Sequence, residues 1–219
     1  WFFQTMFVCA TVSIVSGAVA ERIKIWPFFV FAVAMAGFIY PISMGWQWGK
    51  GWLYVAGFSD FAGSTLVHSA GAAAALAGAL ILGPRLGRFT DTGEAKTMEP
   101  FASSSIPLAT LGVFILWLGW FGFNGGSQLA MGTLDDVTSV ATIFINTNLA
   151  ACAGVMTCAA ISRLVTGKTD VIMMLNGALG GLVAITAEPL APSPIFAIII
   201  GAIGGLVVFY GTILLLKLK

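Results

Sequence analysis

The stretch of sequence that decides the fold covers residues 60–83 and reads DFAGSTLVHSAGAAAALAGALILG. Its length and apolar composition suit a helix that crosses the hydrocarbon core of a bilayer. Apart from Asp60 at its start, His68 is the one ionisable group in the stretch, and it is the single histidine of the chain. An ionisable side chain inside a membrane is costly, so His68 is the first candidate for a functional residue.

The composition of the whole chain predicts an all-α, polytopic membrane protein. Hydrophobic residues make up 58% of the 219 residues and charged residues 9%, whereas soluble domains carry about 25% charged residues. The formal net charge of +1 gives no reason to expect a nucleic acid partner. Cys9, Cys152 and Cys158 fall within apolar stretches, so we expect buried structural thiols rather than a disulfide or a metal site.

Seven apolar runs of the length that a transmembrane helix requires follow one another along the chain. They cover residues 2–20, 25–44, 61–83, 105–124, 138–162, 171–187 and 194–216. We expect them to form a single membrane domain over residues 1–219. The chain opens at Trp1 within apolar sequence and ends at Lys219 as a span finishes, which suggests an excerpt of a longer protein.

Basic residues predict the direction in which the spans cross the membrane. Nine of the ten lysines and arginines fall on one side of the alternating spans, and only Lys50 falls on the other. The nine are Arg22, Lys24, Arg85, Arg88, Lys96, Arg163, Lys168, Lys217 and Lys219. By the positive-inside rule their side is cytoplasmic. The first span therefore enters from outside, and the C-terminal end is cytoplasmic.

A polar stripe is predicted on the third span. Asp60, Ser64, His68 and Gly71 fall within about one 80° sector of a helical wheel at 100° per residue, which suggests the wall of a pathway. The alternative is that Asp60 is a helix N-cap and His68 an interhelical hydrogen-bond donor. We favour the cap for Asp60 taken alone and the functional role for His68, because histidines in membranes usually face a cavity or a partner.

Aromatic residues suggest an entrance on the outer side. Trp48 lies in a Gly/Trp-rich loop at residues 45–59, and indole is the best cation–π surface. Taken alone, Trp48 fits an interfacial aromatic belt better than a cation site. Phe7, beside the polar pair Gln4 and Thr11, could gate a pore, although a phenylalanine more often serves packing. Residues 116–127, LWLGWFGFNGGS, end the fourth span with Phe123 and Ser127 near the same side.

Other residues of the spans point to helix packing. Asn146 and Asn148 are expected to form hydrogen bonds between helices. The segment GALGGLV at residues 177–183 recurs as GAIGGLV at residues 201–207, and we favour close helix contact as the role of both. The sequence has no phosphate-binding loop, metal-ligand cluster or Ser/His/Asp set. We therefore expect no enzyme, no cofactor and no metal.

Five segments in order resemble the ammonium transporter family, the Amt/Mep/Rh proteins, and the bacterial Amt branch most of all. They are FQTMF at residues 3–7, AVAER at 18–22, DFAGSTLVH at 60–68, GWFGFNGGS at 119–127 and LNGALGGLVAITA at 175–187. The resemblance implies an ammonium-transporter fold, an inverted-repeat bundle of eleven helices, of which this chain would hold helices three to nine. It also implies a homotrimer with one pore in each subunit.

The resemblance also implies a role for each candidate residue. Trp48, Phe7 and Ser127 would bind ammonium at the outer entrance, and the rings of Phe7 and Phe123 would form the gate. His68 would be the first of two pore histidines that relay a proton, while the second belongs to the family's tenth helix. Asp60 would be the structural carboxylate of the vestibule, favouring a cation without touching it.

The implied activity is passage of ammonium or ammonia through a hydrophobic pore in the inner (plasma) membrane. The cytoplasmic loop at residues 84–104 would be a contact for a PII-type regulator, by analogy with the family. An alternative is an ammonium sensor, in which the membrane domain transmits occupancy to a signalling domain after Lys219. A gas channel of the Rh type fits less well, because Trp48 and the order of the Phe and Ser segments resemble the Amt proteins.

Overall fold

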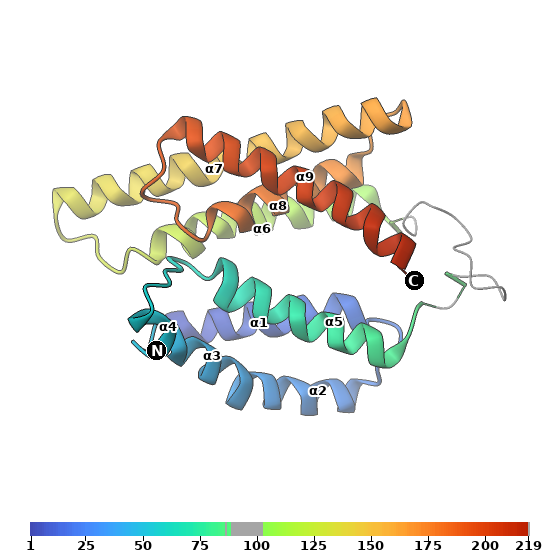
Figure 1. Cartoon of the computed structure of the whole chain (residues 1–219), viewed down its shortest axis with the longest axis horizontal. Coiled ribbons are helices and arrows are strands. Elements are labelled where there is room, and N and C mark those ends of the chain that lie inside the picture. The colour runs from blue at the N-terminus through green and yellow to red at the C-terminus, as the bar shows by residue number, and fades with distance from the viewer. Residues whose placement is uncertain (86, 89–102, 219) are drawn as a thin grey trace. The chain divides into compact units, whose positions relative to one another are not determined.

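The computed structural model describes residues 1–85, 87–88 and 103–218 (Figure 1). Within these ranges the chain forms helices joined by turns and loops, and no strand. The chain divides into two compact units, unit 1 from Trp1 to Lys96 and unit 2 from Thr97 to Lys219. The all-α fold class predicted from composition is confirmed, while a single domain over residues 1–219 stays a prediction.

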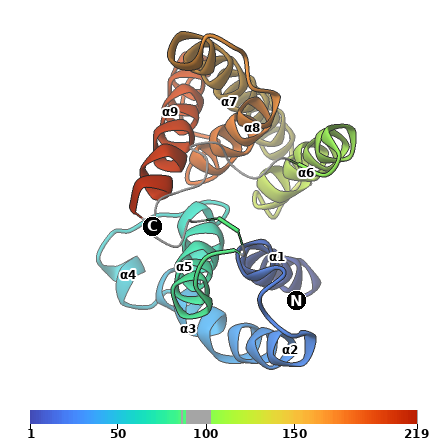
Figure 2. The ribbon, with the colours of Figure 1, turned by 90° about the vertical axis from the view of Figure 1, so that its right-hand side faces the viewer.

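Unit 1 is built around the contact of its first and last helices. In chain order its helices are α1 (Phe2–Val19), α2 (Ile25–Ala34), η1 (Met35–Ile39), α3 (Tyr40–Gln47), α4 (Trp52–Val55), η2 (Ser64–Ser69) and α5 (Ala70–Leu82), where η marks a π-helical turn. Helix α1 packs against η2 and α5 (Figures 1 and 2). Val15 and Val19 of α1 are buried with Ala75 of α5 in one apolar cluster.

Helices α2 and α3 are joined by the π-helical turn η1, and together they form one continuous helical segment. Its outer surface is apolar: Trp26, Val30 and Val33 are each more than two-thirds exposed. A soluble protein rarely exposes so continuous an apolar face, whereas a lipid-facing helix requires it. The short helix α4 follows in the Trp-rich segment that we predicted to be a loop.

Unit 2 contains α6 (Ile106–Gly126), α7 (Leu134–Thr166), α8 (Val171–Ile185) and α9 (Pro194–Leu218). Helices α7, α8 and α9 pack closely against one another, and α6 packs against α7 and α8 (Figure 2). The repeated glycine segments lie at these contacts, as predicted. A Cβ added at Gly204 of α9 would lie 2.5 Å from the carbonyl oxygen of Gly180 in α8, so the two backbones approach as closely as small residues permit.

Six helical stretches of the described chain are long and apolar enough to cross a membrane, and they correspond to six of the seven predicted spans. The seventh, predicted at residues 171–187, is the shorter apolar helix α8, which has 15 residues and ends at Ile185. Helix α7, in contrast, has 33 residues and extends beyond the predicted 138–162. A capping box between Thr133 and Asp136 begins it, and Gly167 with a φ of 76° ends it.

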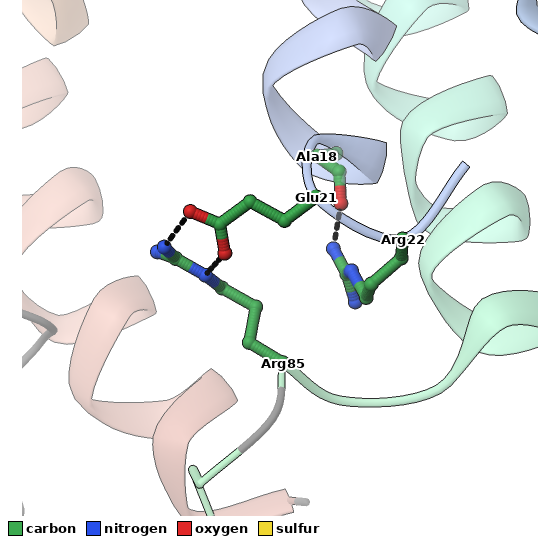
Figure 3. A network of polar contacts seen from close by, with 4 residues as sticks. All are labelled: Ala18, Glu21, Arg22 and Arg85. Carbon is green, nitrogen blue, oxygen red and sulfur yellow. Dashed lines mark hydrogen bonds and ion pairs between the residues drawn. The ribbon is translucent and has the colours of Figure 1, made fainter. Parts of the chain in front are cut away.

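A polar cluster joins the C-terminal ends of α1 and α5 (Figure 3). The Arg22 guanidinium donates hydrogen bonds to the carbonyl oxygens of Ala18 and Gly83, at the ends of α1 and α5. The Glu21 carboxylate accepts two hydrogen bonds from Arg85, at 2.9 Å from Nε and 2.7 Å from Nη2. Arg22 thus satisfies carbonyl groups that a helix end leaves without partners, whereas the exposed Glu21–Arg85 pair contributes at most about 1 kcal/mol.

Candidate functional site

In unit 1, Trp48 is fixed between an aromatic ring of α1 and the loop before η2. The rings of Phe7 and Trp48 meet edge to face with centroids 5.6 Å apart, and Phe3 meets Phe7 in the same way at 4.7 Å. The indole Nε1 of Trp48 donates a hydrogen bond to the backbone carbonyl oxygen of Asp60 at 2.8 Å. Phe7 is buried and Trp48 half-buried. The indole is therefore held by a hydrogen bond at its nitrogen and by edge-to-face packing with Phe7.

The Asp60 carboxylate caps the helix that carries His68. It is 1% exposed, and it accepts four backbone hydrogen bonds between 2.8 and 3.0 Å. The donors are the N–H groups of Gly63, Ser64, Thr65 and Leu66. These are the groups that the first turn of a helix leaves without partners, and their positive dipole end favours a carboxylate. Asp60 thus does the work of a cap, as we favoured for Asp60 taken alone, but Gly63 occupies the N-cap position itself.

The predicted stripe from Asp60 to Gly71 was wrong at its start. Asp60 lies in a non-helical segment, and Gly63 precedes η2 in a left-handed conformation with a φ of 99°. Residues 64–69 then form a π-helical turn, in which successive side chains do not advance by 100°. The helical wheel therefore assumed a regular helix where the backbone is irregular, and the relation between Asp60 and His68 arises through the backbone of the cap.

The backbone carbonyl of Gly63 holds the His68 side chain. The Nδ1 atom of His68 lies 3.1 Å from this oxygen, which also accepts backbone hydrogen bonds from Val67 at 3.0 Å and His68 at 3.1 Å. The His68 side chain is half-buried. Along η2 and α5 the contact with α1 is close, because a Cβ added at Gly71 would lie 2.9 Å from the carbonyl oxygen of Thr11.

The other polar residues of α1 do not form a stripe. Thr11 is completely buried and its hydroxyl donates to the carbonyl oxygen of Phe7 at 2.9 Å, so it bonds within its own helix. Gln4 is half-buried, and its Oε1 is buried with no hydrogen-bond partner. Of the polar face expected from this pair, the Gln4 oxygen near the N-terminal end of α1 is left as an unsatisfied acceptor.

In unit 2, Phe123 and Ser127 lie one turn apart at the end of α6. The Ser127 hydroxyl donates to the carbonyl oxygen of Phe123 at 2.8 Å, and the Phe123 ring packs against Trp120 with centroids 5.7 Å apart. Because the hydroxyl hydrogen is used within α6, the lone pairs of the Ser127 oxygen remain the part of this group that can receive a donor.

A buried hydrogen-bond network lies beside Phe123, and the sequence reasoning missed it. Nε1 of Trp120 donates to the Thr186 hydroxyl at 2.7 Å. The single hydrogen of this hydroxyl faces two acceptors, the carbonyl oxygen of Leu182 at 2.6 Å and Oδ1 of Asn124 at 3.1 Å. The Asn124 amide donates to the Thr147 hydroxyl at 3.0 Å. Asn124, Thr147 and Thr186 are 0% exposed, so the network joins α6, α7 and the end of α8 within the core of unit 2. The signal for it was Asn124 inside the quoted segment 119–127.

The polar residues predicted to join helices behave differently from one another. Asn146 is completely buried, and its amide donates to the carbonyl oxygens of Pro189 at 2.9 Å and Pro192 at 2.8 Å. It therefore fastens α7 to the loop between α8 and α9. Asn148, two residues further along α7, is exposed instead.

The cysteines and the acidic residues offer no metal centre in the part of the chain that the structure describes, where no group of three or more His, Cys, Asp or Glu side chains gathers. Cys9, Cys152 and Cys158 are free thiols. The expectation that all three are buried was wrong: Cys9 and Cys152 are exposed on their helices and only Cys158 is buried. An apolar sequence around a cysteine predicts a span but not the side of the helix that faces a neighbour.

The structure brings four predicted site residues together within unit 1, namely Phe7, Trp48, Asp60 and His68. Phe123 and Ser127 lie together in unit 2. Their meeting with Phe7 and Trp48 in a single entrance and gate stays a prediction. The loop proposed for a regulator, residues 84–104, lies largely outside the described residues.

The helices, the apolar surfaces and the histidine held within a span define a multi-pass α-helical membrane protein. The chain matches the model of the Ammonium Transporter Family over residues 1–219. It belongs to this family, as the resemblance of its five segments indicated.

Sequence identity to individual relatives supports membership of this family. The chain is 42% identical over 221 residues to the ammonium transporter Amt2 of Archaeoglobus fulgidus, a match that covers 96% of this chain and 46% of that protein. An ammonium transporter of Bacillus subtilis is 39% identical over 215 residues, with 98% and 50% covered. The chain thus spans about half the length of the curated relatives that it matches.

Solved structures share the fold. A sensor Amt protein superimposes with a TM-score of 0.88 at 36% identity, covering 95% of this chain and 52% of that one. Mep2 of Candida albicans gives a TM-score of 0.87 at 31% identity, with 96% and 45% covered. The incomplete ammonium-transporter fold predicted from the sequence is confirmed.

Proposed function

We propose that the protein carrying this chain moves ammonium or ammonia across a membrane through a hydrophobic pore. The observation that carries the proposal is the chain of contacts in unit 1: Phe7 packs on Trp48, Trp48 bonds to Asp60, and the Asp60 carboxylate caps the turn that holds His68. An aromatic cation surface is thereby coupled to the single ionisable side chain of a span. Membership of a family of ammonium transporters supports the same activity.

Recognition of the cation would occur at aromatic faces and at one hydroxyl oxygen. A cation–π contact is worth about 0.5–2 kcal/mol, and indole is the best such surface. The Ser127 hydroxyl already donates within α6, so its oxygen is suited to accept a hydrogen bond from ammonium. Potassium has no hydrogen to donate, and this acceptor therefore favours ammonium.

Passage beyond the entrance would require loss of a proton. The rings of Phe7 and Phe123 would form the gate, and past it a bare cation in an apolar pore is costly. Neutral ammonia carries no charge, so its passage through the apolar pore avoids this free-energy cost. His68 would then serve as the hydrogen-bonding and relay group of the pore, and Asp60 would act through structure rather than by contact with the substrate.

The remaining expectations complete the proposal. The protein acts as a transporter and not as an enzyme, in the plasma membrane, as a homotrimer. The nine basic residues lie on the cytoplasmic side, and a PII-type regulator meets the protein there. The similarity to relatives that are named ammonium transporters supports the substrate.

A sensor is the second candidate, and the similarity to a sensor Amt protein favours it. In that case occupancy of the same entrance would be transmitted to a cytoplasmic signalling domain. The sequence that follows Lys219 in the full-length protein distinguishes the two functions, since a kinase or cyclase type of domain there favours sensing.

The experiment that tests the proposal is replacement of Trp48 by leucine in the full-length protein, with ammonium-evoked current measured in proteoliposomes. Loss of the cation–π surface predicts a rise in the half-saturating concentration by about twofold to thirtyfold, as about 0.5–2 kcal/mol implies. Trp46→Leu is the matched control, because Trp46 is an exposed neighbour whose ring packs on Trp52. Equal affinity in wild type and Trp48→Leu would remove Trp48 from the entrance.

A further inference from the structure

The indole of Trp120 in α6 is held by a hydroxyl group at the end of another helix. Its Nε1 atom donates a hydrogen bond to Oγ1 of Thr186 at 2.7 Å, and Thr186 follows the last residue of α8. Trp120 is 8% exposed, so this bond lies away from water. An indole has a single hydrogen-bond donor and no acceptor. The bond therefore directs the nitrogen edge of the ring at the end of α8.

The Thr186 hydroxyl is fixed in turn by the backbone of its own helix. Its oxygen lies 2.6 Å from the carbonyl oxygen of Leu182, one turn earlier, and 3.1 Å from Oδ1 of Asn124. A hydroxyl has one hydrogen and two lone pairs. Because its hydrogen is directed at these acceptors, Thr186 presents a lone pair to the indole. Thr186 is completely buried, so without its oxygen the indole N–H would be left without an acceptor at a site that water does not reach.

The ring of Phe123 packs on this anchored indole. The centroids of the two rings are 5.7 Å apart, and their planes are inclined by 43°. The indole of Trp120 is itself packed with Ala151 of α7 and Leu182 of α8. Phe123 is half-buried, and a phenyl ring has no donor or acceptor group that could fix its χ angles. Its orientation therefore depends on the surfaces that it packs against, and Trp120 is one of them.

We propose that Thr186 is a positioning residue for the Phe123 ring: its hydroxyl holds the indole of Trp120, and the indole limits the orientations that the Phe123 ring adopts. The consequence for transport rests on the proposed function, in which this ring forms part of the gate. Thr186 then determines how wide the gate opens, and so how well the pore distinguishes ammonium from a larger cation such as methylammonium. Helix α8 takes part in the gate in this way without supplying a ring to it.

The orientation of the ring is followed by ¹⁹F NMR of the full-length protein in lipid nanodiscs, with 4-fluorophenylalanine in place of Phe123 alone. We expect a narrow signal from the protein that is otherwise unchanged. Thr186→Val keeps the shape of the side chain and removes the oxygen, so we expect a shifted or broadened signal. Thr186→Ser keeps the hydroxyl and should restore the original signal. An unchanged signal in Thr186→Val would overturn the proposal.

Gly205→Ala separates positioning from stability. A Cβ at Gly205 of α9 would lie 2.8 Å from the carbonyl oxygen of Gly154 in α7, so this variant is destabilised by overpacking between α7 and α9. We expect it to keep the fluorine signal of the wild type. The same change of signal in Gly205→Ala and Thr186→Val would show a general loss of packing and would contradict a positioning role. Trp120→Phe removes the donor of the same hydrogen bond, and we expect it to change the signal as Thr186→Val does, which provides a second test if Thr186→Val does not fold.

Transport measurements connect the ring to selectivity. Ammonium-evoked and methylammonium-evoked currents are compared in proteoliposomes that contain the full-length wild type, Thr186→Val or Thr186→Ser. We expect the ratio of the methylammonium current to the ammonium current to rise about twofold to twelvefold in Thr186→Val, the factor to which one net hydrogen bond corresponds. The ratio should return to the wild-type value in Thr186→Ser. An unchanged ratio in Thr186→Val would remove Thr186 from the gate.

These outcomes are distinct from failure of the proposed function. A wild-type protein that gives no ammonium current would contradict transport. The fluorine signal at position 123 would still decide whether Thr186 positions the ring, because that signal is measured without transport.

Discussion

At the scale of single residues, Asp60 connects more of the candidate site than any other side chain described here. Its carboxylate begins the helix of His68 while its backbone carbonyl holds the indole of Trp48. The residue type and the position before a span predicted a cap. The link to Trp48 was not predictable, because it uses a backbone atom that every residue possesses. The same holds for the Gly63 carbonyl, which no side-chain pattern reveals.

Asp60→Asn is expected to destabilise the protein by about 1–3 kcal/mol for each backbone N–H that loses its acceptor. An asparagine has one side-chain oxygen, whereas both Asp60 oxygens accept two hydrogen bonds each. Thermal unfolding in detergent, followed by tryptophan fluorescence, measures the effect. Asp135→Asn is the control, since Asp135 is exposed at the start of α7. Equal unfolding temperatures in the two variants would contradict the buried cap.

At the scale of elements, the spans were predictable because the bilayer dictates how long and how apolar they must be. Six of them lie where the apolar runs predicted. The π-helical turns η1 and η2 were not predictable, because they depend on contacts with other helices and leave no periodic signal. The network of Asn124, Thr147 and Thr186 escaped prediction for the same reason: its members come from three helical segments.

Thr186→Val removes the acceptor that Nε1 of Trp120 uses and the hydroxyl that contacts Asn124 and the Leu182 carbonyl oxygen. We expect a loss of about 1–3 kcal/mol in the free energy of unfolding. Thr186→Ser keeps the hydroxyl and should retain most of the stability. The measurement is chemical unfolding in detergent. If the Val and Ser variants unfold alike, the hydroxyl has no structural role.

Gly204→Ala should destabilise the contact of α8 and α9 by about 1–3 kcal/mol, as overpacking does. The added Cβ would lie 2.5 Å from the carbonyl oxygen of Gly180 and 3.1 Å from Cβ of Ala184, so backbone must move. In the same helix, a Cβ at Gly211 would meet no atom within 4 Å, and Gly211→Ala should leave the protein as stable or slightly more stable. A lower unfolding temperature for Gly204→Ala alone is the expected result, and equal values would refute the close contact.

At the scale of the whole molecule, the distribution of charge predicts its orientation. Lys50, which the charge pattern predicts to be outside, and Lys24 and Lys168, which it predicts to be inside, are all exposed. The contact of Glu21 and Arg22 with residues 83–85 agrees with the prediction that the ends of the first and third spans lie on one side. The spans and their direction can be predicted from composition and charge because neither property depends on the details of tertiary structure.

A membrane-impermeant amine reagent should therefore modify Lys50 in intact right-side-out vesicles, and Lys24 and Lys168 only after permeabilisation. Mass spectrometry of the labelled full-length protein identifies the modified lysines. Modification of Lys24 or Lys168 in sealed vesicles, with Lys50 protected, would reverse the orientation.

The Arg22 contacts have a consequence for motion. Helix α1, which carries Phe7, and the η2–α5 segment, which carries His68, are joined at one end by a guanidinium that bonds to both helix ends. At the other end Phe7 packs on Trp48, and Trp48 bonds to the residue that caps η2. Two rods fastened at both ends resist sliding along each other. We therefore expect any movement that admits a molecule past Phe7 to be rotation of aromatic side chains about their χ angles, on the fast timescale of rotamers, while the backbone of both helices stays in register.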